Sequence, residues 1–310
     1  MPARDRVIRR SIEEQQHGVR LESFPARAYA GSPAAFLDNL PDILRAHDLR
    51  RFVVLWREAT AAGAPRVVML GGAVIKTGLG PLLAAAVEAG LITHVAMNGS
   101  GAIHDFELAL AGKTSENVGK GLVDGSFGMT LETGRDMNQA VNAGAADGLG
   151  FGESVARWID EHDFPHRRVS LLSACRAAGV PVTVHVALGA DIIHQHPEFD
   201  AGLTGTATGR DFDRLIETLS GARAGACIAN LGSAVVMPEV FLKALTVARN
   251  TTPGVEGFHT AVFDMNVHYR PRVNVVARPS EAGHGEGFYF VGHHEIMLPL
   301  FFGALLERAQ

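Results

Sequence analysis

The chain has 310 residues, 47% hydrophobic and 20% charged, and its 28 basic and 33 acidic side chains give a formal net charge of −5. These values are typical of a soluble globular protein and exclude a disordered, collagen-like or coiled-coil chain. Because the net charge is negative, no broad basic surface is expected, which excludes nucleic acid and anionic lipid as partners. Glycine (35 residues) and histidine (14 residues) are frequent, so candidate sites are sought among them.

The cysteines and the first residues indicate where the protein is found. Cys175 and Cys227 lie in apolar segments and are too few for a disulfide framework. The charged N-terminal sequence lacks the apolar run of a secretory signal, and no apolar stretch is long enough to span a membrane. We therefore expect a cytoplasmic protein without a membrane partner. Residues 1–35 are expected to form an N-terminal arm, followed by one α/β domain over residues 36–310.

Apolar runs and amphipathic segments alternate along the rest of the chain. The first half predicts, in order, a helix at 39–61, a strand at 66–70, a helix at 81–89, a strand at 92–97 and helices at 102–111 and 130–143. The glycine-rich segment 112–152 is expected to hold a functional loop. The second half predicts helices at 168–178, 212–219, 240–249 and 296–307, with strands at 180–187, 226–231 and 259–265. This order predicts a parallel sheet with helices on both faces.

Four turns follow predicted strands, and we expect them at one rim of the sheet, where ligands of open α/β sheets bind. They are Gly71-Gly72, Asn98-Gly99-Ser100-Gly101, Leu188-Gly189-Ala190-Asp191 and Gly232-Ser233. The second turn places glycines between a strand and a helix, so that backbone N–H groups can approach a phosphate. It lacks the third glycine of a dinucleotide fingerprint, and a tight turn also needs glycine for backbone reasons, so both interpretations stay open.

The turns define the predicted cofactor-binding residues. His104 and Asp105 belong with them, since both lie in the first turn of the predicted helix, where they either contact a ligand or cap the helix. The full set is Gly71, Gly72, Asn98, Gly99, Ser100, Gly101, His104, Asp105, Gly232 and Ser233.

Histidines and carboxylates cluster after the predicted strand at 180–187. His194 and His196 share one side of an extended segment, three residues or more beyond Asp191. Two imidazoles and a carboxylate can hold a divalent metal, or they can form ordinary polar contacts in a loop. His185 either ends the strand as a buried, hydrogen-bonded group or faces the site.

A second cluster lies near the C-terminus. His293 or His294 with Glu295 can form a base and the group that orients it, or Glu295 can cap a helix. The predicted catalytic residues are therefore His185, His194, His196, His293, His294 and Glu295. If a metal is present, its expected ligands are Asp191, His194, His196 and His293. No nucleophile elbow of the form Gly-x-Ser-x-Gly occurs, which excludes a hydrolase of that type.

Together, the motifs resemble those of deoxyhypusine synthase, especially its archaeal forms. The similar stretches are Gly71-Gly72 to His104-Asp105, Pro181-Val182 before Asp191, Gly232 to Val236, and Arg278 to Ala282, and the resemblance covers roughly residues 40–310. It implies a Rossmann-like NAD-binding fold, a homotetramer with sites between subunits, and oxidation of a polyamine by NAD. For a cationic substrate, the predicted contacts are Asp191, Glu281, His284 and Glu239.

The chain departs from that family where the catalytic lysine is expected. The sequence there reads Gly283 to Gly287 without lysine, and Met237-Pro238-Glu239 replaces an expected lysine-histidine pair. The resemblance therefore implies a small amine or polyamine-type metabolite, and not a protein lysine, as the substrate.

Three hypotheses for function follow. The first is an NAD-dependent transferase or oxidoreductase acting on a small amine. The second is a metal-dependent lyase or hydrolase that uses the His/Asp/Glu cluster on the same scaffold. The third is a binding protein that kept the fold and lost the chemistry.

Overall fold

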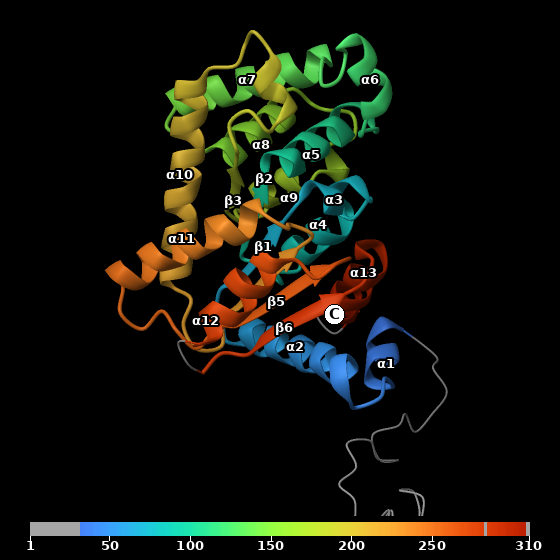
Figure 1. The fold of residues 1–310 in the computed structure, drawn as a ribbon, viewed down its shortest axis with the longest axis vertical. Helices are drawn as coiled ribbons and strands as arrows, with labels where there is room; N and C mark the ends of the chain where they lie inside the picture. Colours follow the sequence, from blue (N-terminus) through green and yellow to red (C-terminus); the bar gives the residue numbers. More distant parts are fainter. Residues whose placement is uncertain (1–31, 282–283, 308–310) are drawn as a thin grey trace, which may run out of the picture.

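One parallel sheet of six strands forms the centre of the protein (Figure 1). The computed structural model describes residues 32–281 and 284–307. The strand order is β3-β2-β1-β4-β5-β6, and each neighbouring pair is parallel. The strands are β1 (Arg66–Leu70), β2 (His94–Asn98), β3 (Val182–His185), β4 (Cys227–Leu231), β5 (His259–Asp264) and β6 (Gly287–Val291). The α/β class and the parallel sheet expected from the sequence are confirmed.

The connecting segments are mostly helical. The first six helices are α1 (Pro33–Asp38), α2 (Leu44–Ala61), α3 (Gly72–Lys76), α4 (Gly80–Glu88), α5 (Gly99–Ala111) and α6 (Val118–Asp124). They are followed by α7 (Leu131–Ala146), α8 (Phe151–Glu161), α9 (Leu171–Ala177), α10 (Ala201–Ser220), α11 (Val236–Thr251), α12 (Arg278–Glu281) and α13 (His294–Glu307). Shorter turns are η4 (Arg167–Val169) and η5 (Ile192–Gln195), and η6 (Pro271–Ala277) is π-helical.

Helices cover both faces of the sheet. Side chains alternate along β1, so Val68 and Leu70 join the larger core with α2, α5, α8 and α13, whereas Val67 and Met69 join the core under α10 and α11. All five residues of β1 are buried. A central parallel strand covered on both faces is continuously apolar for this reason, which is why the sequence predicted β1 with its correct bounds.

Several elements were not predicted. β6, α3, α6 and α8 have no counterpart among the expected elements, and α10 begins at Ala201, whereas a helix was expected only from Phe212. The first half of α10 is rich in glycine and threonine and lacks apolar periodicity. It is helical because Asp200 caps it, accepting a hydrogen bond from the Leu203 N–H (2.9 Å). Of the expected N-terminal arm, residues 1–31 lie outside the described residues.

Helices α2 and α13 pack against the β5–β6 end of the sheet (Figure 1), and aromatic side chains fill the contact. Phe301 of α13 lies 5.4 Å from the Phe52 ring, 5.6 Å from the Trp56 ring and 5.2 Å from the Phe263 ring, between centroids. All four rings are buried. Each such contact adds to the burial of apolar surface, so the start of α13 is held firmly beside the strand ends.

Side chains of α10 cover the outer edge of β3. The buried carboxylate of Asp211 accepts hydrogen bonds from the N–H groups of Val184 (2.7 Å) and Gly152 (2.9 Å). The Thr208 hydroxyl donates to the Val184 carbonyl (2.8 Å). These contacts satisfy backbone groups that an uncovered edge strand leaves available for aggregation. Burial raises the pKa of Asp211 to about 7, although the backbone hydrogen bonds oppose the shift.

The raised pKa of Asp211 predicts a pH-dependent stability. Between its ordinary value of 3.8 and about 7, the folded state holds a proton that the unfolded state releases, so this contribution is full in acid and is lost as pH rises through 7. Asp211→Asn does not titrate. From pH 5 to pH 8 the wild type should lose roughly 2–3 kcal/mol of its free energy of unfolding relative to the variant, because only the wild type has the titrating Asp211. Urea unfolding of both proteins at both pH values measures this change. A difference in free energy of unfolding that is the same at pH 5 and pH 8 would contradict the prediction.

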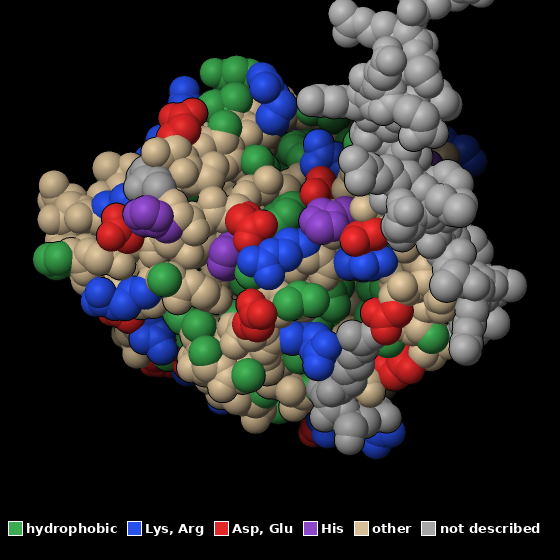
Figure 2. Space-filling model, turned by 90° about the horizontal axis from the view of Figure 1, so that it is seen from below, with side chains coloured by type: hydrophobic (Ala, Val, Ile, Leu, Met, Phe, Trp, Pro, Cys, Tyr) green, Lys and Arg blue, Asp and Glu red, His purple; other side chains and the backbone are tan. Residues whose placement is uncertain are grey.

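The outer surface carries charges of both signs. On the face seen from below in Figure 1, basic and acidic side chains alternate with histidine and apolar ones, with no extended patch of one sign (Figure 2). Within the described residues, no helix combines the length and apolar character needed to cross a bilayer.

Candidate functional site

The carboxyl ends of β1 and β4 mark the point where the strand order reverses, which is where open α/β sheets bind ligands. The loops after these strands touch. The Gly71 N–H donates to the Leu231 carbonyl (3.0 Å), and a Cβ on Gly71 would lie 2.3 Å from the Gly232 carbonyl oxygen. Only glycine fits at position 71, because the atom it would meet belongs to the backbone. The two turns predicted to share a rim therefore form one continuous backbone surface.

The turn after β2 joins this surface. A Cβ on Gly72 would lie 2.5 Å from the Ser100 hydroxyl, so the start of α3 packs directly against the start of α5. The Asn98 side chain caps α5 by accepting from the Gly101 N–H (3.0 Å). With 13 residues, α5 is long enough for its N-terminus to favour negative charge. The glycines predicted to bind a cofactor thus lie together at the carboxyl edge of the sheet.

His294 lies over the same surface. It is the first residue of α13, is only 2% exposed, and its Nε2 atom has no hydrogen-bond partner among the described residues. Gly232 has a positive φ of 60°, and a Cβ on it would lie 2.7 Å from that Nε2. A buried ring nitrogen without a partner costs about 1–3 kcal/mol of stability, which makes His294 a candidate for hydrogen bonding to a ligand or a water molecule.

Asp191 approaches the start of α5 from the loop after β3. A Cβ on Gly99 would lie 2.1 Å from its Oδ2 atom, which is buried and has no hydrogen-bond partner among the described residues. Burial raises the pKa of Asp191 to about 6. His194, on the same loop, accepts a hydrogen bond at Nδ1 from the Gly189 N–H (3.1 Å), and burial lowers its pKa. A partly buried carboxylate is therefore held against the helix N-terminus.

The other predicted catalytic groups lie in different surroundings. His185 Nε2 is 3.0 Å from the Thr183 hydroxyl, and burial lowers the pKa of His185 to about 4. His196 Nε2 is 2.8 Å from the Gly128 carbonyl oxygen, in contact with the segment before α7. His293 is exposed, with Nδ1 3.8 Å from the carboxylate of Glu295, which is also exposed. Of the predicted histidines, His294 is the one placed on the glycine surface.

The structure does not assemble the expected metal site. Among residues 32–281 and 284–307, no group of three or more His, Cys, Asp or Glu side chains is placed to hold a metal ion. The expected ligands Asp191, His194, His196 and His293 are separated because His196 is bound to the Gly128 carbonyl and His293 extends into solvent from the loop after β6. The His-x-His spacing suggested shared ligation, but the 3-10 turn η5 directs these side chains apart.

Two predicted cofactor-binding side chains act in helix capping. The buried Asp105 carboxylate accepts hydrogen bonds from the N–H groups of Leu171 (2.8 Å) and Leu172 (3.1 Å), so it caps α9. The Ser233 hydroxyl accepts from the Met237 N–H (3.2 Å) at the start of α11. His104 Nδ1 lies 2.7 Å from the Thr114 hydroxyl, and its ring borders Gly72.

The predicted substrate-binding residues are dispersed. Glu281 and His284 precede β6, so they lie at the amino edge of the parallel sheet, opposite the glycine surface. The neighbouring Glu286 agrees with that placement. Its carboxylate pairs with Arg51 (2.7 Å) and lies 3.9 Å from Nδ1 of His259, the first residue of β5, which marks the amino edge of the sheet. Glu239, near the start of α11, is paired with Lys243 and with Arg270 (3.1 Å). Asp191 alone among these four lies against a glycine turn.

A histidine–carboxylate pair at the end of β5 was not predicted. Asp264, 5% exposed, is the last residue of β5, and its Oδ1 lies 3.5 Å from Nε2 of His268. Its backbone carbonyl accepts from the Gly292 N–H (3.0 Å), and the preceding carbonyl of Phe263 accepts from Gly232 (2.9 Å). The pair therefore borders the loops that carry Gly232 and His294. The sequence offered one signal for this pair, a charged residue, Asp264, near the end of the strand predicted at 259–265.

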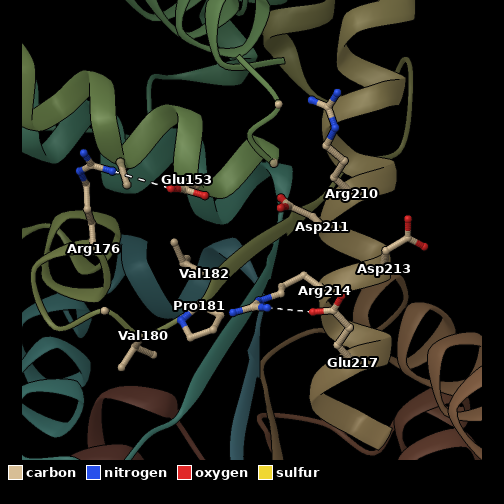
Figure 3. A pocket seen from close by; sticks show the side chains of 14 residues that line it. Glu153, Arg176, Val180, Pro181, Val182, Arg210, Asp211, Asp213, Arg214 and Glu217 are labelled. Atoms are coloured by element: carbon tan, nitrogen blue, oxygen red, sulfur yellow. Dashed lines mark hydrogen bonds and ion pairs between the residues drawn. The ribbon is translucent and has the colours of Figure 1, made fainter. Parts of the chain in front are cut away.

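A separate cavity of about 550 Å³ lies beside β3, between α8 and α10 (Figure 3). Its charged side chains pair with one another, Arg214 with Glu217 (2.8 Å) and Arg176 with Glu153 (3.9 Å). Arg210 donates to two carbonyl groups at the end of α7. Such partly exposed pairs contribute little stability, and the cavity lies away from the point where the strand order reverses, so the glycine surface is the stronger candidate.

No protein-family model and no curated protein matches this chain. Solved structures do share its fold. AgrE in a ternary complex with ornithine and NAD⁺ is 18% identical with a TM-score of 0.55, and covers 84% of this chain and 33% of its own. A putative LOR/SDH protein from Methanococcus maripaludis S2 is 17% identical with a TM-score of 0.53, and covers 92% of this chain and 74% of its own.

A putative deoxyhypusine synthase from Entamoeba histolytica is 8% identical with a TM-score of 0.51, and covers 87% of this chain and 91% of its own. The chain spans only about a third of the length of the AgrE and ArgZ chains, ArgZ being a cyanobacterial arginine dihydrolase. The fold is therefore similar to those of deoxyhypusine synthase-like and LOR/SDH-like α/β proteins, of which the sequence resemblance implied the first.

Proposed function

We propose that the protein is an NAD-dependent enzyme that oxidises a small amine, with the dinucleotide on the glycine surface. The observation that carries the proposal is the buried, unpartnered Nε2 of His294 beside Gly232, at the reversal of the strand order. A structural histidine in that position would be expected to find a partner within the protein. The AgrE structure with ornithine and NAD⁺, which shares the fold, supports the proposal.

The glycine turns fit a dinucleotide for a physical reason. The backbones of Gly71 and Gly232 lie so close together that a Cβ on Gly71 would overlap the Gly232 carbonyl oxygen. The N-terminus of α5 lies next to them, because Gly72 packs against Ser100. The N–H groups of glycine residues can approach phosphate oxygens closely because no side chain intervenes. The positive end of α5 stabilises the negative charge of these oxygens. When bound, NAD⁺ supplies a hydride acceptor. Nε2 of His294 would form one hydrogen bond with the ligand, as donor or as acceptor according to the tautomer, and so fix the orientation of the ligand.

Asp191 supports an amine as substrate or a hydroxyl-bearing group as ligand, since its Oδ2 atom has no partner among the described residues. When ionised, this carboxyl group only accepts hydrogen bonds and its negative charge attracts an ammonium group, and its raised pKa of about 6 still allows ionisation at neutral pH. Asn98, Gly99, Gly101 and Ser233 would shape the surface through their backbone. The polyamine-type substrate expected from the sequence resemblance stays a prediction.

We further propose that a second copy of the chain covers this edge in a homo-oligomer, a tetramer by resemblance. Large apolar side chains are exposed in the loops after β4, β5 and β6 and at the start of α13: Val235, Met265, Val267, Tyr269, Val291 and Ile296. Exposed apolar groups gathered at one edge are typical of an interaction surface. The cytoplasmic location also stays a proposal.

Isothermal titration calorimetry with NAD⁺ tests the proposed function. We expect saturable binding with one site per chain and a dissociation constant between about 1 μM and 1 mM, the range in which enzymes commonly bind small ligands. Absorbance at 340 nm then reports NAD⁺ reduction with a panel of small amines that includes L-ornithine and 1,4-diaminobutane. Absence of NAD⁺ binding at millimolar concentration would contradict the proposal.

A further inference from the structure

The Asp264–His268 pair has the geometry of a proton acceptor with an orienting carboxylate. Asp264 ends β5 with its side chain 6% exposed, whereas the His268 side chain is 41% exposed, so the carboxylate is inside and the imidazole faces outward. The Asn266 N–H donates to the same Oδ1 (3.2 Å), which fixes the carboxylate. Buried carboxylates are costly unless they are paired, so the pair is a defined feature of this loop.

Tyr289 of β6 holds the histidine backbone from the other side. Its hydroxyl accepts a hydrogen bond from the His268 N–H (3.1 Å) and donates to the Asn266 carbonyl (2.8 Å). The segment from Asp264 to His268 is thus fixed at three points, by the strand, by Tyr289 and by the ion pair. A catalytic imidazole needs such support, because a misplacement of about 1 Å can lower a rate by about 100-fold.

The direction of the pair determines which ring nitrogen is available. The closest atoms of the pair are Nε2 of His268 and Oδ1 of Asp264 (3.5 Å), so the carboxylate faces Nε2 and favours a hydrogen on that nitrogen. In the neutral ring, Nδ1 then holds the lone pair. No hydrogen bond to Nδ1 occurs in the described part of the chain. Arg270, two residues further along the chain, is paired with Glu239 of α11 (3.1 Å).

We propose that His268, oriented by Asp264, is the proton acceptor of this site, an inference that rests on the proposed amine oxidation. An alkylammonium group must lose a proton before its carbon can release a hydride. In this step the N–H bond of the ammonium group breaks, a bond forms between that proton and Nδ1, and the ammonium becomes a neutral amine. The imidazolium charge is stabilised by Asp264, as in other histidine–carboxylate pairs.

NMR of the full chain labelled with [¹³C]histidine tests the proposal without a known substrate. His268→Gln assigns the His268 signal. We expect Asp264→Asn to weaken the response of the His268 signal to NAD⁺, because the carboxylate contact that orients the ring is removed. NAD⁺ and NADH are each expected to shift the His268 signal, and to different extents. The matched control is the Asp42–His47 pair on the α2 side (2.8 Å, both about half exposed), whose signal should not respond to either nucleotide.

The outcomes separate this proposal from the proposed function. If calorimetry detects no NAD⁺ binding, the proposed function fails and the inference fails with it. If NAD⁺ binds but the His268 signal is unchanged, or responds equally in the wild type and in Asp264→Asn, only the inference is overturned. Where L-ornithine or 1,4-diaminobutane reduces NAD⁺, His268→Gln should lower kcat by about 100-fold or more with little change in KM, and His47→Gln should change neither.

Discussion

Replacing His294 with methionine is expected to weaken NAD⁺ binding by about 10- to 100-fold while leaving the fold at least as stable. The Nε2 atom is buried without a partner, so its removal ends a desolvation cost of about 1–3 kcal/mol. Methionine has a similar volume and adapts to irregular space. The hydrogen bond offered to the ligand is lost at the same time, and each 1.4 kcal/mol corresponds to a tenfold change in affinity. Calorimetry and urea unfolding measure the two effects.

His294→Gln provides the matched comparison, since its amide can still hydrogen-bond to a ligand. We expect it to retain more NAD⁺ affinity than His294→Met and to gain less stability. If His294 were purely structural, His294→Met would be less stable than the wild type and would bind NAD⁺ with unchanged affinity.

Gly71→Ala should impair both stability and NAD⁺ binding. The added Cβ would lie 2.3 Å from the Gly232 carbonyl oxygen, so the loops after β1 and β4 must separate. Overpacking of this kind costs about 1–3 kcal/mol, and we expect NAD⁺ affinity to fall at least ~10-fold because the two turns no longer form one surface. Thermal unfolding and calorimetry check the two expectations.

Gly205→Ala is the control for that variant. Gly205 lies within α10, where an added Cβ meets nothing within 4 Å. Alanine in a helix interior is favoured over glycine, so the control should be more stable by about 0.5–1 kcal/mol with unchanged NAD⁺ affinity. Equal NAD⁺ affinities of the Gly71 and Gly205 variants would remove the glycine surface as the binding site.

The strands carrying the site were predictable because they are buried on both faces. β1 and β4 are fully buried, mostly apolar runs followed by glycine, and their parallel order follows from the helices between them. The turns at Gly71, Asn98 and Gly232 could therefore be placed at one rim. β6 was missed because it is a short edge strand in which exposed and buried residues alternate after a glycine-rich segment.

The side chains around the rim were less predictable. His293 and His294 look equivalent in the sequence, yet the first is exposed and the second is buried at the start of α13, because the aromatic packing of Phe301 fixes the helix. Glu281 and His284 were grouped with the site although they precede β6. Asp264 ends β5 and His268 lies four residues further on, in a segment without a motif, so only the fold shows that they meet.

Hydrogen–deuterium exchange with and without NAD⁺ tests the location of the site most directly. We expect NAD⁺ to slow exchange in three segments that are far apart in the sequence, 71–74, 98–102 and 232–237, together with the start of α13. These are the backbone groups that form the glycine surface. Protection confined to the cavity beside β3, at residues 148–153, 179–182 and 210–217, would contradict the assignment of the NAD⁺ site to the glycine surface.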